Sequence, residues 1–154
     1  MLHILSGTWF IISTNFPMWL KPGMQSPSFT YTITEKKGQE VLLDEVKYLK
    51  NTKAKTIKGY DYPDTKNNNA FTWRGKGLLI IAKSKWEVKL MDEQKQWAVI
   101  YFSKTLFTPE GVDIISRTAA LDKSTLEVIK TKMAADSLLK KHIPSLQTLS
   151  EKID

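Results

Sequence analysis

The chain has 154 residues, of which 42% are hydrophobic and 25% charged, and its formal net charge is +7. This length suits one domain with one core, and the hydrophobic fraction is too high for a disordered chain. The absence of cysteine excludes disulfides, thiol nucleophiles and thiolate metal sites. No apolar run of the sequence approaches the ~20 residues that a membrane-spanning helix needs.

The basic residues are spread along the chain. Twenty-one of the 23 are Lys, and Arg74 and Arg117 are the two arginines. Dispersed lysines are typical of a solvated surface, whereas attraction to an anion, such as a fatty-acid carboxylate, an acidic head group or nucleic acid, is the alternative. The N-terminus does not resemble a signal peptide, because it has no basic region and its apolar stretch is interrupted at His3 and Ser6. We therefore expect a cytoplasmic protein unless a leader was removed.

Short segments of strand character follow one another along most of the chain. Residues 29–34 alternate apolar and polar side chains, which is the period of a half-buried strand. The other expected strands are residues 7–13, 41–49, 52–62, 71–74, 78–81, 86–90, 96–103 and 112–117, with a turn near residues 82–85. Eight or nine short strands with no helix between them predict an all-β antiparallel barrel or sandwich.

The segment of residues 14–23 contains two prolines and a glycine, which predicts a loop. It also carries Phe16, Met18, Trp19 and Leu20, too much apolar surface to leave in water. We expect this loop to pack down on the rest of the protein, either as a lid or as a segment pinned to the core.

The character of the sequence changes after residue 122. Ser124 and Glu127 have the spacing of a capping box, which predicts a helix over residues 124–136. Its apolar stripe consists of Leu126, Ile129, Met133 and Ala134. We expect the stripe to pack against the outside of the barrel, with a partner-binding face as the alternative.

Three sequence blocks carry a family resemblance. Gly7-Thr8-Trp9 opens the first strand, residues 96–101 form the second block, and Ser116-Arg117 closes the last strand. Together they resemble the signature of the lipocalins, ligand-carrying barrels of the calycin superfamily. Within that family the sequence is most similar in character to the bacterial and apolipoprotein-D-like branch. The chain departs from the family by having Lys95-Gln96 before Trp97, where an Asp-Tyr pair is usual.

The resemblance implies a fold and three structural residues. The fold is an eight-stranded antiparallel up-and-down β-barrel over about residues 5–121, with a C-terminal helix and tail over about 122–154 packed outside, all in a single domain. In the family the Trp plugs one end of the barrel and the Arg packs across it, which assigns these roles to Trp9 and Arg117, beside Gly7. A guanidinium stacks on an indole better than an ammonium does, which agrees with an arginine kept at this position.

Strand alternation then predicts the lining of the barrel. The candidate ligand-binding residues are mostly aromatic and aliphatic, and they are Ile11, Ser13, Phe16, Met18, Trp19, Phe29, Tyr31, Ile33, Phe71, Trp73, Trp86, Val88, Trp97, Val99 and Tyr101, with Leu90 on the face of Trp86 and Val88. Such a lining suits an apolar pocket with few polar anchors. Candidate contacts for an anionic head group are Tyr31, Tyr48, Tyr60 and Arg74.

From the resemblance we expect non-catalytic binding and transport of a small hydrophobic ligand, such as a fatty acid or lysolipid. No cofactor, metal site or enzymatic activity is expected. His3 and His142 are predicted to be surface residues, and Asp44-Glu45 and Asp92-Glu93 to be solvated among lysines. Peripheral membrane contact and the oligomeric state stay open.

Two other functions stay open. One is nucleic-acid binding, because Lys83-Ser84-Lys85-Trp86 and Lys95-Gln96-Trp97 place basic residues next to aromatic ones. The other is a partner-binding module whose barrel is completely filled by side chains.

Overall fold

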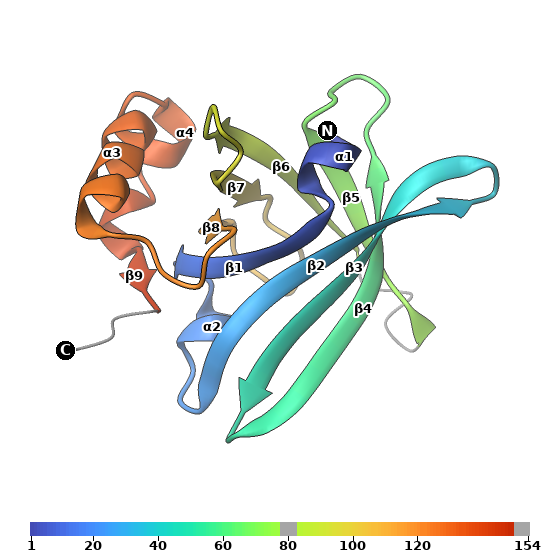
Figure 1. Cartoon of the computed structure of the whole chain (residues 1–154), viewed down its shortest axis with the longest axis horizontal. Helices are drawn as coiled ribbons and strands as arrows, with labels where there is room; N and C mark the ends of the chain where they lie inside the picture. The colour runs from blue at the N-terminus through green and yellow to red at the C-terminus, as the bar shows by residue number, and fades with distance from the viewer. Residues whose placement is uncertain (78–82, 150–154) are drawn as a thin grey trace.

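The computed structural model describes residues 1–77 and 83–149. Its eight main strands form a closed antiparallel barrel, because β1 bonds to both β2 and β8 and each of the others bonds to its neighbours in sequence (Figure 1). The strands are β1 Gly7–Thr14, β2 Met24–Lys36, β3 Gln39–Lys50, β4 Lys53–Pro63, β5 Ala70–Gly75, β6 Lys83–Met91, β7 Trp97–Phe102 and β8 Gly111–Ser116. The predicted up-and-down barrel is confirmed.

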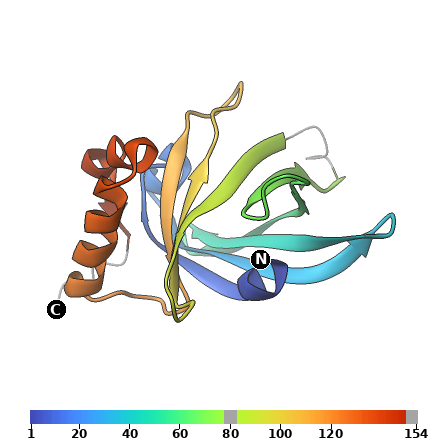
Figure 2. The same ribbon diagram turned by 90° about the horizontal axis from the view of Figure 1, so that it is seen from above.

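Helices lie outside this ring. They are α1 Leu2–Leu5, α2 Pro17–Leu20, α3 Lys123–Ala134 and α4 Ser137–Lys140, followed by a 3-10 turn Ile143–Ser145 and a short strand β9 Gln147–Thr148. Figure 2 shows α3 lying along the outer surface of the barrel, and β9 pairs with β1. Within residues 1–77 and 83–149, no helix has the length and apolar character needed to cross a membrane.

Two apolar clusters lie on opposite sides of the barrel wall. The inner cluster consists of Leu5, Trp9, Ile11, Trp19, Phe29, Tyr31, Leu42, Val46, Phe71, Trp86, Val88, Ala98, Ile100 and Ile115. The outer cluster consists of Ile12, Trp97, Val99, Val112, Ile114, Leu126, Ile129, Met133 and Leu139. The outer cluster joins the wall to α3 and α4, which confirms the predicted packing of the C-terminal helix.

The start of α3 differs from the predicted capping box. Asp122 is the N-cap, and its carboxylate accepts a hydrogen bond from the Thr125 backbone N–H at 2.8 Å. Ser124 instead donates its hydroxyl to the same carboxylate at 2.9 Å. Asp is as good an N-cap as Ser, and here it precedes the expected cap by two positions. Ala134, placed in the predicted stripe, is exposed.

Two β-bulges shift side chains from one face of the wall to the other. Between Ile11 and Ser13 the register with β8 slips, so Ile12 and Ser13 both face outward and the Ser13 hydroxyl lies 3.0 Å from that of Thr148. A second bulge between Val88 and Leu90 places Leu90 opposite Val99, in contact with the outer cluster. The inward positions predicted for Ser13 and Leu90 are therefore wrong, since strict alternation fails at a bulge.

The inward positions predicted for Trp97, Val99 and Tyr101 are also wrong. All three belong to or pack against the outer cluster, while Ala98 and Ile100 belong to the inner one. Every residue of β7 is apolar or aromatic, because its outer face is covered by the C-terminal segment. Alternation cannot identify the inner face of a strand that is buried on both sides.

Two of the predicted connections also change. The expected turn near residues 82–85 is wrong at Lys83–Lys85, because β6 begins at Lys83, and the expected strand 78–81 lies outside the described residues. The predicted loop of residues 14–23 contains the single-turn helix α2. Pro17 is its first residue, where a missing N–H costs nothing.

Candidate functional site

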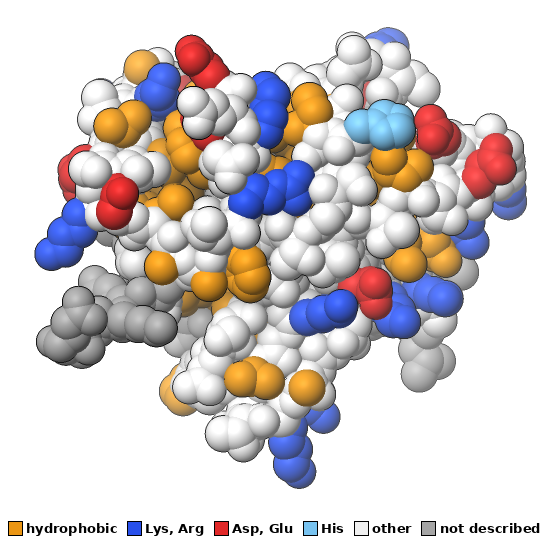
Figure 3. Space-filling view, viewed as in Figure 1, with side chains coloured by type: hydrophobic (Ala, Val, Ile, Leu, Met, Phe, Trp, Pro, Cys, Tyr) orange, Lys and Arg blue, Asp and Glu red, His pale blue; other side chains and the backbone are white. Residues whose placement is uncertain are grey.

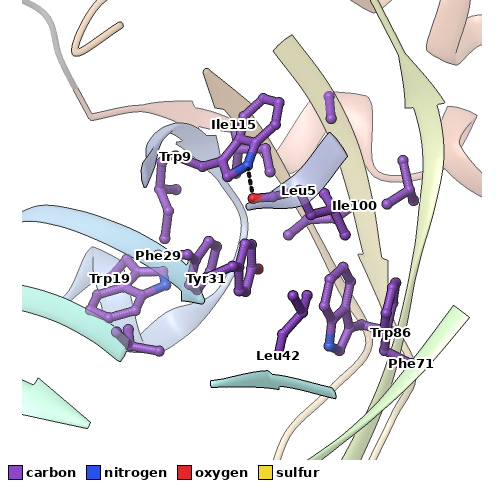
Figure 4. Packing of buried hydrophobic residues seen from close by; sticks show 14 residues of the cluster. Leu5, Trp9, Trp19, Phe29, Tyr31, Leu42, Phe71, Trp86, Ile100 and Ile115 are labelled. Carbon is purple, nitrogen blue, oxygen red and sulfur yellow. Dashed lines mark hydrogen bonds between the residues drawn. The ribbon is translucent and has the colours of Figure 1, made fainter. Parts of the chain in front are cut away.

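One end of the barrel is closed by a stacked pair of side chains. Trp9 is fully buried, and its indole N–H donates to the Leu5 carbonyl of α1 at 2.8 Å (Figure 4). The Arg117 guanidinium carbon lies 3.7 Å from the centroid of the Trp9 ring. Arg117 also donates to the carbonyls of Ile4 at 2.6 Å and Thr8 at 3.2 Å. The predicted Trp9–Arg117 contact is confirmed, and it ties both ends of the barrel sequence to α1.

Gly7 leaves room for this pair. Its φ is +106°, a conformation that L side chains rarely adopt, and a Cβ there would lie 3.0 Å from an Arg117 guanidinium nitrogen. The glycine of the sequence block is therefore required by backbone conformation and by the closeness of the guanidinium.

The barrel encloses a cavity of about 490 Å³. Its lining comes from α2 and the segment before it, from β2 to β8 and from the segment after β7: Phe16, Met18, Trp19, Phe29, Tyr31, Asp44, Val46, Ile57, Trp73, Lys83, Ser84, Trp86, Phe102, Ser103, Thr105, Leu106, Phe107, Thr108 and Asp113. The alternative of a completely filled barrel is therefore wrong. Leu106 and Phe107 are almost fully exposed, which places the rim of the cavity at this loop.

The structure brings about half of the predicted ligand-binding residues together. Those that line the cavity are Phe16, Met18, Trp19, Phe29, Tyr31, Trp73 and Trp86. Ile11, Phe71 and Val88 belong to the inner cluster and Ile33 packs against it, but these four do not line the cavity. Ser13, Trp97, Val99 and Tyr101 lie on the outer face, as described above.

Stacked aromatic rings form one wall of the cavity. Tyr31 stacks between Phe29 and Trp86, with centroid separations of 5.9 Å on each side, and Phe71 stacks on Trp86 at 4.6 Å. Figure 4 shows these rings in sequence across the interior. Such contacts fix the orientation of each ring, so this wall is preformed.

The segment around α2 covers part of the cavity, as the sequence predicted. Phe16 meets Phe102 edge-on at 4.8 Å, and Trp19 meets Tyr48 at 5.4 Å. A Cβ on Gly111 would lie 2.8 Å from the Phe16 ring, so the ring can occupy this position only because residue 111 has no side chain.

Sequence reasoning missed three carboxyl groups buried in the barrel. Asp44, Asp61 and Asp113 are 4%, 0% and 1% exposed, and the expectation that Asp44 is solvated is wrong. Asp44 lies on β3 diagonally across from Asp61 on β4, and Asp61 accepts a hydrogen bond from the Trp86 indole N–H at 2.9 Å. Burial raises the pKa of Asp61 to about 7. Burial, and then the neighbouring Asp61, raise the pKa of Asp44 well above its usual range, which favours the neutral, protonated form of this carboxyl group.

Asp113 stands apart from this pair. It lies on β8 opposite Thr14, lines the cavity, and one of its carboxyl oxygens has no hydrogen-bond partner among the described residues. Burial raises the pKa of Asp113 to about 7, and a hydrogen bond from Thr14 opposes this shift. An acidic residue inside the apolar run Val112–Ile115 was the sequence signal that could have identified it.

The side chains predicted to hold an anionic head group are dispersed. Tyr31 lines the cavity, but Tyr48 packs on Trp19, and the Tyr60 ring lies under Lys36 at 4.4 Å. Arg74 is exposed and does not line the cavity. Among the described residues that line the cavity, Lys83 alone carries a positive charge, and its side chain is exposed to solvent.

The two histidines lie in different surroundings. His142 is 7% exposed and bonded to Asn15 at 2.9 Å, so its predicted surface position is wrong, whereas His3 is exposed. Burial lowers the pKa of His142. No group of three or more potential metal ligands occurs in residues 1–77 and 83–149.

The two tryptophans on which the nucleic-acid hypothesis depends are buried. The aromatic members of its two motifs, Trp86 and Trp97, are 3% and 8% exposed, so they cannot stack on bases. Figure 3 shows Lys and Arg side chains scattered over one face, with acidic residues between them.

Solved structures of lipocalins superpose on the whole barrel. Insecticyanin from the tobacco hornworm Manduca sexta is 14% identical, with a TM-score of 0.73, covering 97% of this chain and 80% of that one. The siderocalin Ex-FABP is 14% identical with a TM-score of 0.68, covering 95% and 93%. The possum milk whey lipocalin trichosurin, solved with bound 4-ethylphenol, is 13% identical with a TM-score of 0.65, covering 97% and 98%.

The chain therefore has the lipocalin fold, as its sequence blocks indicated. No protein-family model matches the sequence, and no curated protein sequence does so either.

Proposed function

We propose that the protein binds and carries a small, largely apolar molecule in the barrel cavity without transforming it chemically. The observation that supports this most directly is the cavity of about 490 Å³, whose lining is mostly aromatic and aliphatic. This volume lies in the range of small-molecule sites, and apolar lining with few polar groups is typical of them. The rigid aromatic wall means that little conformational entropy is lost on binding.

The solved neighbours support the same kind of function. Trichosurin was solved with 4-ethylphenol, a small aromatic molecule, and Ex-FABP is described as having dual ligand specificities. For this chain the candidate contacts are Phe29, Tyr31, Trp73 and Trp86, with Phe16 and Trp19 over them.

Two features of the lining bear on the finer prediction of a fatty acid or lysolipid, and they act in opposite directions. Lys83 in the lining supports an anionic head group near the rim. Asp44 and Asp113 oppose one deeper inside, because a ligand carboxylate beside a buried carboxyl group is repelled unless one of them is protonated.

The test is titration with the neutral fluorescent probe N-phenyl-1-naphthylamine. Val46 lines the cavity, so Val46→Trp should occupy part of it and reduce the fluorescence increase that the parent protein gives. Val128→Trp adds the same side chain at a position of α3 that is 51% exposed, and it should leave the titration unchanged. No uptake by the parent protein, or equal uptake by Val46→Trp, would contradict the proposal.

A further inference from the structure

We propose that the cavity selects small amphipathic cations, with the ammonium group of an amine at Asp113 and Asp44 and its apolar part on the aromatic wall. This inference rests on the proposed function, because it concerns what the same cavity prefers. The proposed preference for cations is the opposite of the preference for anions that the net charge of +7 suggests.

The first observation is the unsatisfied carboxyl oxygen of Asp113. The residue is 1% exposed, it lines the cavity, and this oxygen accepts no hydrogen bond from the described residues. An unpaired polar atom that is buried is costly, and an ionised carboxylate is costlier still. A ligand N–H donor with a positive charge supplies the missing partner for both the hydrogen bond and the charge.

The second observation is the position of Asp44. It also lines the cavity, and behind it Asp61 is held by the Trp86 indole N–H. Asp61 does not line the cavity, and its carboxylate orients Trp86 by accepting the indole N–H. Asp44 and Asp113 therefore lie on different strands, β3 and β8, and both contribute to the same cavity.

The third observation is the chemistry of the wall. The cavity is lined by the rings of Phe29, Tyr31, Trp86 and Phe102. The face of an aromatic ring carries partial negative charge and attracts a cation, most strongly when water is excluded. The same faces contribute nothing comparable to an anion.

The titratable and charged groups around the cavity can be assigned to their strands. Tyr31 comes from β2, Asp44 from β3, Asp61 from β4 behind it, Lys83 from β6 and Asp113 from β8. Lys83 is exposed, so water screens its charge from the buried acids. Burial raises the pKa of Asp113 to about 7 and that of Asp44 well above its usual range, so an amine must displace protons from both carboxyl groups to bind, and its affinity should rise with pH.

The experiment compares three ligands of one shape by calorimetry at pH 7.5: 2-phenylethylamine, 2-phenylethanol and phenylacetate. We expect the amine to bind about tenfold more tightly than the alcohol, or better, since a hydrogen bond to a charged group is worth that much, and phenylacetate to bind most weakly. Asp113→Asn keeps the shape of the side chain and should remove the amine preference while leaving alcohol binding intact. Asp44→Asn should reduce the preference in the same direction, and exposed Glu93→Gln should leave it unchanged.

The outcomes separate the two proposals. If the alcohol binds as well as the amine, or if phenylacetate binds best, the cation preference is wrong while ligand binding in the cavity stands. If none of the three ligands binds and the neutral probe is also not taken up, both proposals are wrong. An amine preference that survives in both Asp variants would also overturn the inference.

Discussion

The Arg117 guanidinium stacks on the Trp9 indole with 3.7 Å between its central carbon and the ring centroid. Trp9 lies in β1 and Arg117 directly follows β8, the neighbouring strand, so the pair joins residues more than 100 positions apart in the chain. The pair and the hydrogen bonds of Arg117 to Ile4 and Thr8 hold α1 against the closed end of the barrel. Neither side chain lines the cavity, so we expect the role of the pair to be structural.

Arg117→Lys should therefore lower the free energy of unfolding by about 1–2 kcal/mol, since a lysine loses the planar stacking and the paired donors. Urea denaturation measures this value. Arg74→Lys is the matched control, because Arg74 is exposed, and it should change stability little. An Arg117 variant as stable as the parent protein would show that the stacked pair contributes nothing, and probe uptake should be unaffected in either variant.

Asp113 makes stability depend on pH. Its pKa is about 7 in the folded state against an ordinary value of 3.8, so the folded state holds the proton more tightly than the unfolded state. The contribution of this group is fully present below about pH 4 and is lost as pH rises through 7. We expect Asp113→Asn to match the parent protein near pH 4, to be the more stable of the two from about pH 5 upward, and to melt about 5 °C or more above it at pH 8.5.

The comparison with Asp113→Asn is needed because other groups titrate in the same range. Burial lowers the pKa of His142, so that group contributes stability which is lost as pH falls. The two proteins share this effect, so the difference between their melting curves reports on Asp113. A difference independent of pH would contradict the assignment.

Gly111 should matter because of Phe16. A Cβ at Gly111 would lie 2.8 Å from the Phe16 ring, so Gly111→Ala should destabilise the protein by about 1–3 kcal/mol through overpacking. In the double variant with Phe16→Ala, the alanine at 111 should cost clearly less, because the ring is gone and only the Asn15 Oδ1 contact at 3.1 Å remains. A double-mutant cycle of thermal unfolding measures this coupling, and strictly additive effects would argue against the contact.

The outer cluster makes a separate prediction about α3. Ile129 is fully buried between the helix and the barrel wall, so Ile129→Ala should cost about 2–5 kcal/mol. Val128, its half-exposed neighbour, should cost little when changed to Ala. Because the outer cluster lies across the wall from the cavity, probe affinity measured well below the melting temperature should be equal in the two variants.

The barrel was predictable because its evidence is local and repeated. Alternation in residues 29–34 and the blocks around Trp9 and Arg117 require no knowledge of long-range contacts. The faces of β1, β6 and β7 were not predictable from alternation alone. Two bulges reverse the pattern at Ser13 and Leu90, and β7 is apolar on both faces.

The buried acids were missed for a different reason. Asp44 stands beside Glu45 and near lysines in sequence, which is typical of a solvated site, yet its strand turns it inward. Asp113 could have been noticed, because an acid between Val112 and Ile114 has apolar neighbours on both sides. No sequence pattern showed that Asp44, Asp61 and Asp113, which lie on three different strands, are all buried in the interior of the barrel.

Binding of a ligand in the cavity can be observed in a crystal structure of the protein with 2-(4-bromophenyl)ethanol. Bromine gives an anomalous signal that locates the molecule without ambiguity. The account predicts a bromine peak inside the barrel, beside the rings of Tyr31, Trp86 and Phe102. A cavity without the peak, or peaks confined to the outer surface at saturating ligand, would contradict it.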